Sequence, residues 1–289
     1  MDITIRLLDS SEAAALGAMT FPRFRKGLGA PRTIAVGALT GGDCVGLGLA
    51  SLPGAPDRRG EVLSIFVAAE HRGRGLATGL LGALEQALAA AGVASAELSF
   101  ASDKPTTPAF ERVLAKRGWA APRASTYIGR ADRRVRSAPW AQTPLPEGME
   151  LFPWTALRPE ERAAIEARGR DSGWYPEELS PFAEDEILDP VTSVGARRGG
   201  EVIGWMVNHR VAPGTIRYST LFVDPALRDR GCGVALCGAA VCRQDWDAMP
   251  IALCAVKADN KAMLLAMRGN LAAYLAVTET RVSTRDLTA

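Results

Sequence analysis

One strand–turn–helix pattern occurs twice in this sequence, and the repeat limits the possible folds more than any other feature. Residues 61–77 read EVLSIFVAAEHRGRGLA, and residues 217–233 read RYSTLFVDPALRDRGCG. In each copy an apolar run ends in Phe-Val and is followed by four turn residues. Arg-x-x-Gly-x-Ala/Gly then opens an apolar stretch typical of a helix. Val67 and Val223 are 156 residues apart, as are the first arginines of the two motifs. Two copies at one offset indicate a duplicated domain.

Length and composition are typical of two ordinary globular domains. A chain of 289 residues suits two domains of roughly 130–150 residues each. No apolar run approaches the roughly 20 residues that span a bilayer, and the N-terminus lacks a basic segment followed by an apolar one. We therefore expect a cytoplasmic protein without a membrane partner. A formal net charge of +2 argues against nucleic-acid binding, which usually needs a strongly basic face.

The cysteines and histidines do not favour a metal site. The chain has five cysteines, an odd number, and only two histidines. Cys232, Cys237 and Cys242, at intervals of five, could lie along one helix. Because so few other ligands are available, we expect small buried thiols in a reducing compartment and no metal.

The order of expected elements is similar in the two halves. Strands and helices alternate in the first half, which closes with a strand over residues 124–130. Residues 132–148 contain several prolines and a cluster of arginines but no sustained apolar periodicity, which predicts a solvated linker. We therefore predict one domain over residues 1–131 and a second over residues 149–289.

The two turns resemble the acyl-CoA binding motif of the GNAT superfamily of N-acyltransferases. The first copy is Arg72-Gly73-Arg74-Gly75-Leu76-Ala77, and the second is Arg228-Asp229-Arg230-Gly231-Cys232-Gly233. The resemblance covers nearly the whole chain in tandem, as in bacterial two-domain members such as mycothiol synthase. It implies an α/β fold of the α+β type with two GNAT-like domains, each a mixed, mostly antiparallel sheet flanked by helices.

Physical chemistry independently favours a phosphate site at each turn. Three and five residues after the first arginine of each motif stand small residues, Gly75 and Ala77 in the first copy and Gly231 and Gly233 in the second. They keep side chains small where the backbone must approach a pyrophosphate. The following helix offers unpaired N–H groups and partial positive charge. In the family the preceding strand also splays from its neighbour and holds the pantetheine arm. The resemblance therefore implies CoA contacts at Phe66, Val67, Arg72, Gly73, Arg74, Gly75, Leu76, Ala77 and Thr78, and at Phe222, Val223, Arg228, Asp229, Arg230, Gly231, Cys232 and Gly233.

A candidate general base is present in the first half only. Many family members place a carboxylate six residues before the valine that ends the motif strand. Glu61 occupies that position in the first half, and Arg217, which cannot act as a base at neutral pH, occupies it in the second. Glu61 is therefore the candidate base, and a solvated strand-end carboxylate is the alternative.

The usual acid of the family, a tyrosine in the last helix, is missing from both halves. Leu114 stands near that position in the first half, and Leu265 or Met267 in the second. Tyr274 is a weak candidate acid and Ser219 could orient a water, although a structural role is the alternative for each. A CoA thiolate can leave without a strong acid, so the missing tyrosine does not exclude catalysis.

Features of the second half suggest a role in acceptor recognition. Asn260 resembles an asparagine that the family places near pantetheine, or else caps a helix. Residues 154–190 combine aromatic and acidic side chains that would suit a cationic amine, or that would form an amphipathic helix pair with a wet acidic face. Asp229 beside a pyrophosphate is unfavourable, so we expect the first half to bind CoA.

The leading hypothesis is an N-acetyltransferase that uses acetyl-CoA as co-substrate and acylates a small primary amine. A second hypothesis is a non-catalytic protein that binds or senses acyl-CoA. A third uses an aminoacyl-tRNA or carrier-protein thioester as donor, held by the arginines of residues 133–136, and it predicts affinity that falls steeply with salt. The sequence makes no prediction of the oligomeric state.

Overall fold

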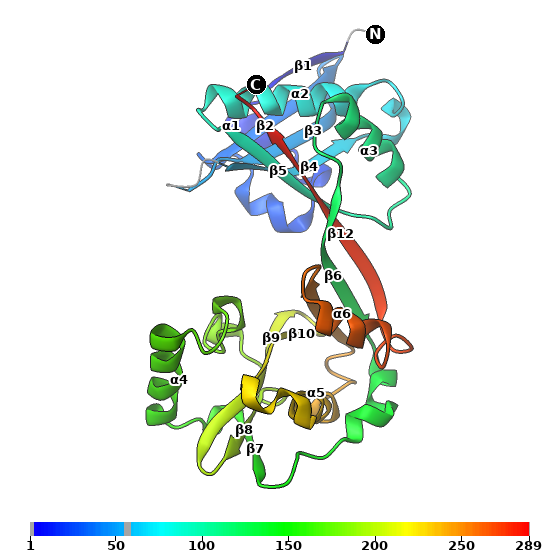
Figure 1. Cartoon of the computed structure of the whole chain (residues 1–289). Helices are drawn as coiled ribbons and strands as arrows, with labels where there is room; N and C mark the ends of the chain where they lie inside the picture. Colours follow the sequence, from blue (N-terminus) through cyan, green and yellow to red (C-terminus); the bar gives the residue numbers. More distant parts are fainter. Residues whose placement is uncertain (1–2, 55–58, 289) are drawn as a thin grey trace. The chain divides into compact units, whose positions relative to one another are not determined.

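The computed structural model describes residues 3–54 and 59–288, which form two compact units (Figure 1). Unit 1 comprises the residues up to Ser125 together with those from Glu279 onward, and unit 2 comprises Thr126–Thr278. Within each unit, parallel and antiparallel strands pair into a mixed sheet region flanked by helices, so the predicted fold class is confirmed.

The sheet of unit 1 is mostly antiparallel with one parallel pair. Only β4 and β5 run parallel, and every other neighbouring pair is antiparallel. The strands follow the order β1 (Thr4–Leu7), β2 (Thr33–Thr40), β3 (Asp43–Ser51), β4 (Arg59–Val67), β5 (Ser95–Ala101) and β12 (Ala276–Asp286), of which residues from Glu279 belong to this unit.

The long helix of unit 1 provides most of its core. Helix α2 (Leu76–Ala90) packs across β2, β3 and β4, because its leucines recur at helical spacing and are buried. It ends before Gly92, whose φ of +78° lies in the left-handed region that ends helices. The other helical segments are α1 (Ser10–Ala14), α3 (Thr107–Lys116) and the 3-10 turns η1 (Gly17–Met19), η2 (Pro22–Gly27) and η3 (Ala69–His71).

Unit 2 repeats this architecture. Its parallel pair is β10 and β11, and its other neighbouring strands are antiparallel. The strand order is β6 (Arg123–Ala131), of which residues from Thr126 belong to this unit, β11 (Ile251–Lys257), β10 (Thr215–Val223), β9 (Glu201–Ala212), β8 (Val194–Arg198) and β7 (Met149–Pro153). Its helices are α4 (Pro159–Ser172), α5 (Cys232–Arg243) and α6 (Lys261–Arg268), with 3-10 turns η4 (Arg133–Ser137), η5 (Pro139–Gln142), η6 (Trp154–Ala156), η7 (Glu177–Leu179), η8 (Asp185–Ile187) and η9 (Pro225–Arg230).

Each sheet receives its last strand from the other half of the sequence. Strand β6, expected to close the first half, pairs with β11 through Thr126–Ala131. Strand β12, the last of the chain, pairs with β5 through Thr280–Asp286. The two repeats have equivalent strand edges, so either strand could pair with either edge. The hydrophobic periodicity of a strand does not specify which of the two edges it pairs with. The two units defined by contacts therefore differ from the predicted domains, residues 1–131 and 149–289. Those ranges follow the repeat in the sequence, and the domain boundaries stay a prediction.

The segment 132–148 is not the solvated connector that its composition indicated. Val135, Ala138 and Ala141 are buried in the core of unit 2, where η4 and η5 pack on α5. The reason is local: these small apolar residues recur every three residues, the spacing of a 3-10 helix, and so share one face. The arginines of this segment, Arg133, Arg134 and Arg136, are exposed, and the first two form ion pairs with Asp247 and Asp132.

The buried carboxylate of Glu85 forms hydrogen bonds and an ion pair that connect three elements of unit 1. Glu85 of α2 is 4% exposed and accepts hydrogen bonds from Arg117 Nη2 at 2.5 Å and from Trp119 Nε1 at 2.8 Å. Arg285 of β12 forms an ion pair with the same carboxylate at 3.2 Å. The side chain thus connects α2, the end of α3 and the strand that arrives from the other half of the sequence.

Neutralising this carboxylate should be costly. We expect Glu85→Gln to lower the free energy of unfolding by about 3 kcal/mol, because it leaves arginines without their buried counter-charge. Glu97→Gln, which removes the exposed ion pair with Arg59, should cost less than about 1 kcal/mol. Urea denaturation of both variants measures the difference. Equal losses would contradict the assignment of a structural role to Glu85.

Candidate functional site

Both glycine turns have the backbone geometry of an anion site. Gly75 and Gly231 each have a φ of +80° and stand at the start of α2 and α5, and no side chain caps either helix. The first N–H groups of both helices are therefore left for another partner. A Cβ built on either glycine meets no atom within 4 Å, so the space in front of each turn is open. Gly73 is also left-handed and open.

The first arginine of each motif holds the turn against its strand. Arg72 Nε donates to the carbonyl of Val67 at 3.0 Å, and Arg228 Nε donates to that of Val223 at 3.3 Å. The resemblance implies that these two arginines contact CoA. Their Nε atoms are instead used for structure, and the exposed Arg74 and Arg230 stay available. The side chain of Asp229 lies outside the described residues.

The strand before each turn separates from its parallel neighbour. Pairing of β4 with β5 ends at Val62 and Leu98, and pairing of β10 with β11 ends at Tyr218 and Cys254. Beyond these pairs, the Phe-Val ends of β4 and β10 have no strand on that side among the described residues. We call each separation a fork. The predicted splay is thus present in both units, and it exposes a strand edge able to hydrogen-bond an extended ligand.

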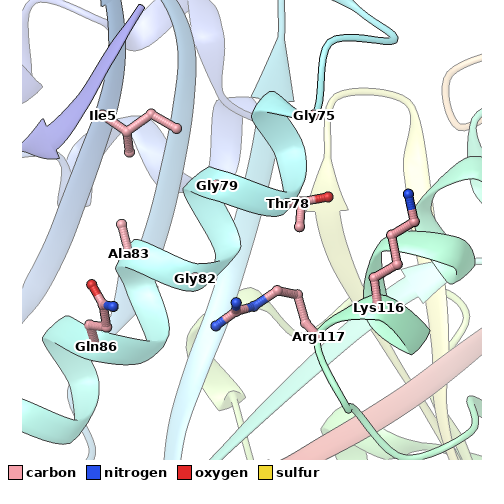
Figure 2. A pocket seen from close by; sticks show the side chains of 9 residues that line it. All are labelled: Ile5, Gly75, Thr78, Gly79, Gly82, Ala83, Gln86, Lys116 and Arg117. Atoms are coloured by element: carbon pink, nitrogen blue, oxygen red, sulfur yellow. The ribbon is translucent and has the colours of Figure 1, made fainter.

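An open groove runs along the outer face of α2 from its N-terminal turn (Figure 2). Its volume is about 590 Å³, and Lys116 and Arg117 stand on one side of it. Lys116 is exposed and forms no ion pair within the described part of the chain. The floor is formed by small residues, since the lining comprises Ile5, Gly75, Thr78, Gly79, Gly82, Ala83, Gln86, Lys116 and Arg117.

The corresponding face of α5 in unit 2 is covered. Gly238, at the repeat offset from Gly82, lies so close to the chain that a Cβ there would be 2.6 Å from the Ala141 carbonyl oxygen. Further along α5, Gln142 Nε2 approaches Cys242 Sγ at 3.4 Å. Met267, buried in the core, stands where unit 1 has Lys116, counted from the glycine that follows each last helix. Among the described residues the two turns are alike, but a basic groove continues from the turn of unit 1, whereas η5 covers the matching face of α5.

The candidate base and the tyrosine position differ in exposure. Glu61 is exposed on β4 and pairs with Glu97 of β5 one residue before the fork begins. Leu114, at the tyrosine position of unit 1, is fully buried, whereas Leu265 of unit 2 is 75% exposed. The structure thus provides no tyrosine at either position, and Glu61 stays a predicted base.

Two further predicted residues have structural contacts. The side chain of Asn260 accepts a hydrogen bond from the Met263 amide at 3.1 Å, the N-cap arrangement weighed as the alternative. Tyr274 packs against the core of unit 2. A ligand role for either residue stays a prediction.

The acidic and aromatic residues expected to bind a cationic amine are mostly engaged with the protein. The aromatic rings of this segment pack with Trp205 and Phe222 into a buried cluster on one face of the unit 2 sheet. Four of the acids form ion pairs with basic side chains: Glu178 with Lys257, Asp185 with Arg162, Glu184 with Arg217, and Asp189 with Arg210. The aromatic rings and most of the acidic groups of this segment thus have partners within the protein, and we do not place the amine site there.

Sequence reasoning missed two groups of polar residues. Lys116 and Arg117 were passed over because they end a helix with no motif of its own, although their place before Gly118 was a usable signal. His209 was weighed only as a zinc ligand. The structure places His209 Nδ1 2.6 Å from Ser219 Oγ, so a candidate residue has a partner that sequence reasoning did not consider.

Other functional classes lack support in the described residues. No group of three or more His, Cys, Asp or Glu residues in the described ranges could hold a metal ion. All five cysteines are free thiols, and burial raises the pKa of Cys237 to about 12. Over residues 3–54 and 59–288, no helix combines the length and apolar character needed to cross a bilayer.

A mixed sheet with a parallel fork and an uncapped glycine turn, present twice, defines the class of tandem proteins with two GNAT-type domains. The acetyltransferase (GNAT) family model matches residues 6–115 and 153–267. The chain belongs to this family. No curated protein matches the sequence.

Solved structures support the tandem fold. A tandem GNAT protein from the clavulanic acid biosynthesis pathway matches with a TM-score of 0.65 and 17% identity, covering 99% of this chain and 99% of that one. A GCN5-related N-acetyltransferase from Sphaerobacter thermophilus matches with a TM-score of 0.65 and 17% identity over 99% and 96% of the chains. One from Kribbella flavida gives a TM-score of 0.52 at 17% identity, with 95% of each chain covered. At 17% identity these matches show a shared fold and nothing further.

Proposed function

We propose that this chain is an acetyl-CoA-dependent N-acyltransferase, that unit 1 binds the CoA, and that the acceptor is a small primary amine. The observation that carries the proposal is the continuity between the uncapped turn at Gly75 and the groove beside Lys116 and Arg117. Family membership supports acyl transfer in general, and this geometry supports the choice of unit.

The residues of unit 1 fit a ligand that carries several phosphates. The helix start contributes about half an elementary positive charge, and its unpaired N–H groups suit a pyrophosphate. Lys116 adds a full charge farther along the groove, where a further phosphate could be bound. From Gly75 to Gln86 the groove follows α2 for about 16 Å at 1.5 Å per residue, enough for an extended ligand. In the described part of unit 2, η5 packs on the matching face of α5.

The fork of unit 1 would place the reacting end of the ligand near Glu61. The free edge of β4 beyond Val62 can hydrogen-bond an amide-containing arm, as a strand would. Acetyl-CoA, when bound, supplies the activated acyl group. Glu61, exposed beside the fork, would take the proton that the attacking amine must lose, either directly or through a water.

Thiol release from acetyl-CoA, measured with a panel of primary amines, tests the activity. We expect Glu61→Gln to lower kcat/KM by at least about 100-fold, the usual contribution of a general base, with CoA affinity unchanged. Glu97→Gln changes the carboxylate directly opposite on β5 and should leave the rate near that of the unaltered protein.

Two results would count against this proposal. An unchanged rate of thiol release in Glu61→Gln would show that Glu61 is not the general base. CoA binding without thiol release across a broad amine panel would favour the second hypothesis, a non-catalytic protein that binds acyl-CoA. That hypothesis has a structural basis, because the position of the family's acidic tyrosine holds Leu114, which is buried.

A further inference from the structure

We propose that Ser219 of unit 2 is a nucleophile that His209 activates, and that it accepts an acyl group from activated acyl esters or thioesters. This goes beyond the proposed function, because it concerns the unit whose groove is covered and does not require CoA binding in unit 1.

The first observation is a close contact between a hydroxyl and an imidazole. Ser219 Oγ lies 2.6 Å from His209 Nδ1, and Arg217 Nε donates to the same oxygen at 2.9 Å. The other acceptor within reach of the hydroxyl hydrogen, the Arg217 carbonyl, is more distant at 3.2 Å. We therefore assign the hydroxyl hydrogen to Nδ1. A serine that donates to a base while it accepts from a cation is arranged for proton removal.

The imidazole is suited to accept that proton. His209 is 2% exposed, and its Nε2 is buried without a hydrogen bond of ordinary geometry within the described residues, although the Ala183 carbonyl lies near enough to act on the ring. Burial, and next the Arg217 cation, lower the pKa of His209, while Glu184, the Ala183 carbonyl and Asp185 oppose this shift. The ring is therefore neutral at pH 7, with a lone pair available. The same acidic groups and carbonyl would stabilise the imidazolium that forms transiently.

The backbone that positions the cation is strained. Glu184 forms an ion pair with Arg217 Nη2, and it is the one non-glycine residue of the described chain with a positive φ, +62°. Such conformations persist where surrounding contacts require them, and they concentrate at functional sites. The contact fixes the guanidinium so that its Nε can point at Ser219.

Ser219 also lies at the fork of unit 2. It follows Tyr218, the last residue of β10 that pairs with β11, and the register with β9 shifts between Tyr218 and Thr220. This bulge leaves Ser219 as the extra residue, partly exposed. Beyond the fork, β10 has a free edge whose N–H groups could stabilise an oxyanion.

Unit 1 does not repeat this cluster. By strand register, its corresponding residues are Ser51 for His209, Glu61 for Arg217 and Leu63 for Ser219. The nucleophile, base and cation are thus all specific to unit 2. The packing role of these strands is the same in both units, so it does not explain the three changes.

The proposed step is a transfer of the acyl group from the ester or thioester to Ser219 Oγ. Oγ bonds to the acyl carbon, the bond from that carbon to the leaving sulfur or oxygen breaks, and the hydroxyl proton passes to His209 Nδ1 and then to the leaving group. The products are O-acylserine and a free thiol or alcohol, and the imidazole returns to its neutral form.

p-Nitrophenyl acetate, which does not depend on the CoA groove, tests the inference with the full-length protein. We expect nitrophenolate release and one acetyl group on the peptide that contains Ser219, both seen by absorbance and peptide mass mapping. His209→Gln should slow acylation by at least about 100-fold. Ser219→Cys should keep a labelled residue, now as a thioester. Ser64→Ala removes a β4 serine that bonds Thr20, and it should keep the label on Ser219.

A label that is absent from Ser219 in the unaltered protein would overturn the proposal, and so would a label that survives there in His209→Gln at an undiminished rate. Because the mapping is done first on the unaltered chain, a variant that fails to fold does not decide the result. Failure here would also leave thiol release to amines untouched, so the two proposals are judged separately.

Discussion

Gly75→Glu is expected to weaken CoA binding by at least about 100-fold, equal to about 2.7 kcal/mol. The new side chain would enter the open space in front of the α2 turn and place a carboxylate where a pyrophosphate would bind. It would also force a non-glycine residue to adopt a φ of +80°, which costs roughly 1–2 kcal/mol of stability.

Gly231→Glu is a matched control. It has the same φ, the same open surroundings and the same place at a helix start, so its cost to folding should be similar. Isothermal titration of both variants with CoA, together with thermal melting, separates binding from stability. We expect near-normal affinity in Gly231→Glu because the groove of unit 2 is covered. Loss of binding in Gly231→Glu, with normal binding in Gly75→Glu, would place CoA in unit 2.

Deletion of residues 279–289 should destabilise unit 1 by at least about 3 kcal/mol. Val282 is 5% exposed and Leu287 packs against the α2 core, and each buried apolar side chain of this size contributes about 1.5 kcal/mol or more. The deletion also removes the Arg285 partner of Glu85 and leaves one edge of β5 unpaired.

Hydrogen exchange locates that loss within the chain. Amides of β5 (Ser95–Ala101) should lose protection, whereas those of β11 in unit 2, which pair with β6, should keep theirs. Adding a peptide of residues 279–288 in trans should restore protection in β5. Uniform loss across both units would show that β12 is not the specific closing strand of unit 1.

The sequence predicts the repeated architecture because that architecture depends on local signals. A glycine that must adopt a positive φ, a leucine periodicity of one helical turn and an apolar strand are all readable from a few adjacent residues. Gly75 and Gly231 therefore have the geometry that the motif indicated, and both forks lie where the family resemblance placed them. The strand exchange could not be predicted in this way, because a strand pattern in β6 or β12 does not specify the edge with which that strand pairs.

The candidate site is only partly predictable for the same reason. The turn is contiguous in sequence, whereas the groove brings together Ile5, α2 and the end of α3. The cover on α5 comes from residues whose prolines and arginines suggested solvent. His209 and Ser219 come from neighbouring strands, and their contact depends on a one-residue shift of register at a bulge that no composition pattern reveals.

The exchanged strands have a consequence for the order in which the protein is made. Unit 1 is translated first, yet its sheet lacks a strand until β12 leaves the ribosome, after every residue of unit 2. For most of synthesis β5 therefore presents a bare edge, which is the kind of surface that recruits unwanted strands. Unit 2 can complete its sheet earlier, because β6 precedes β11. Unit 1 can therefore complete its strand pairing only after unit 2 has been translated.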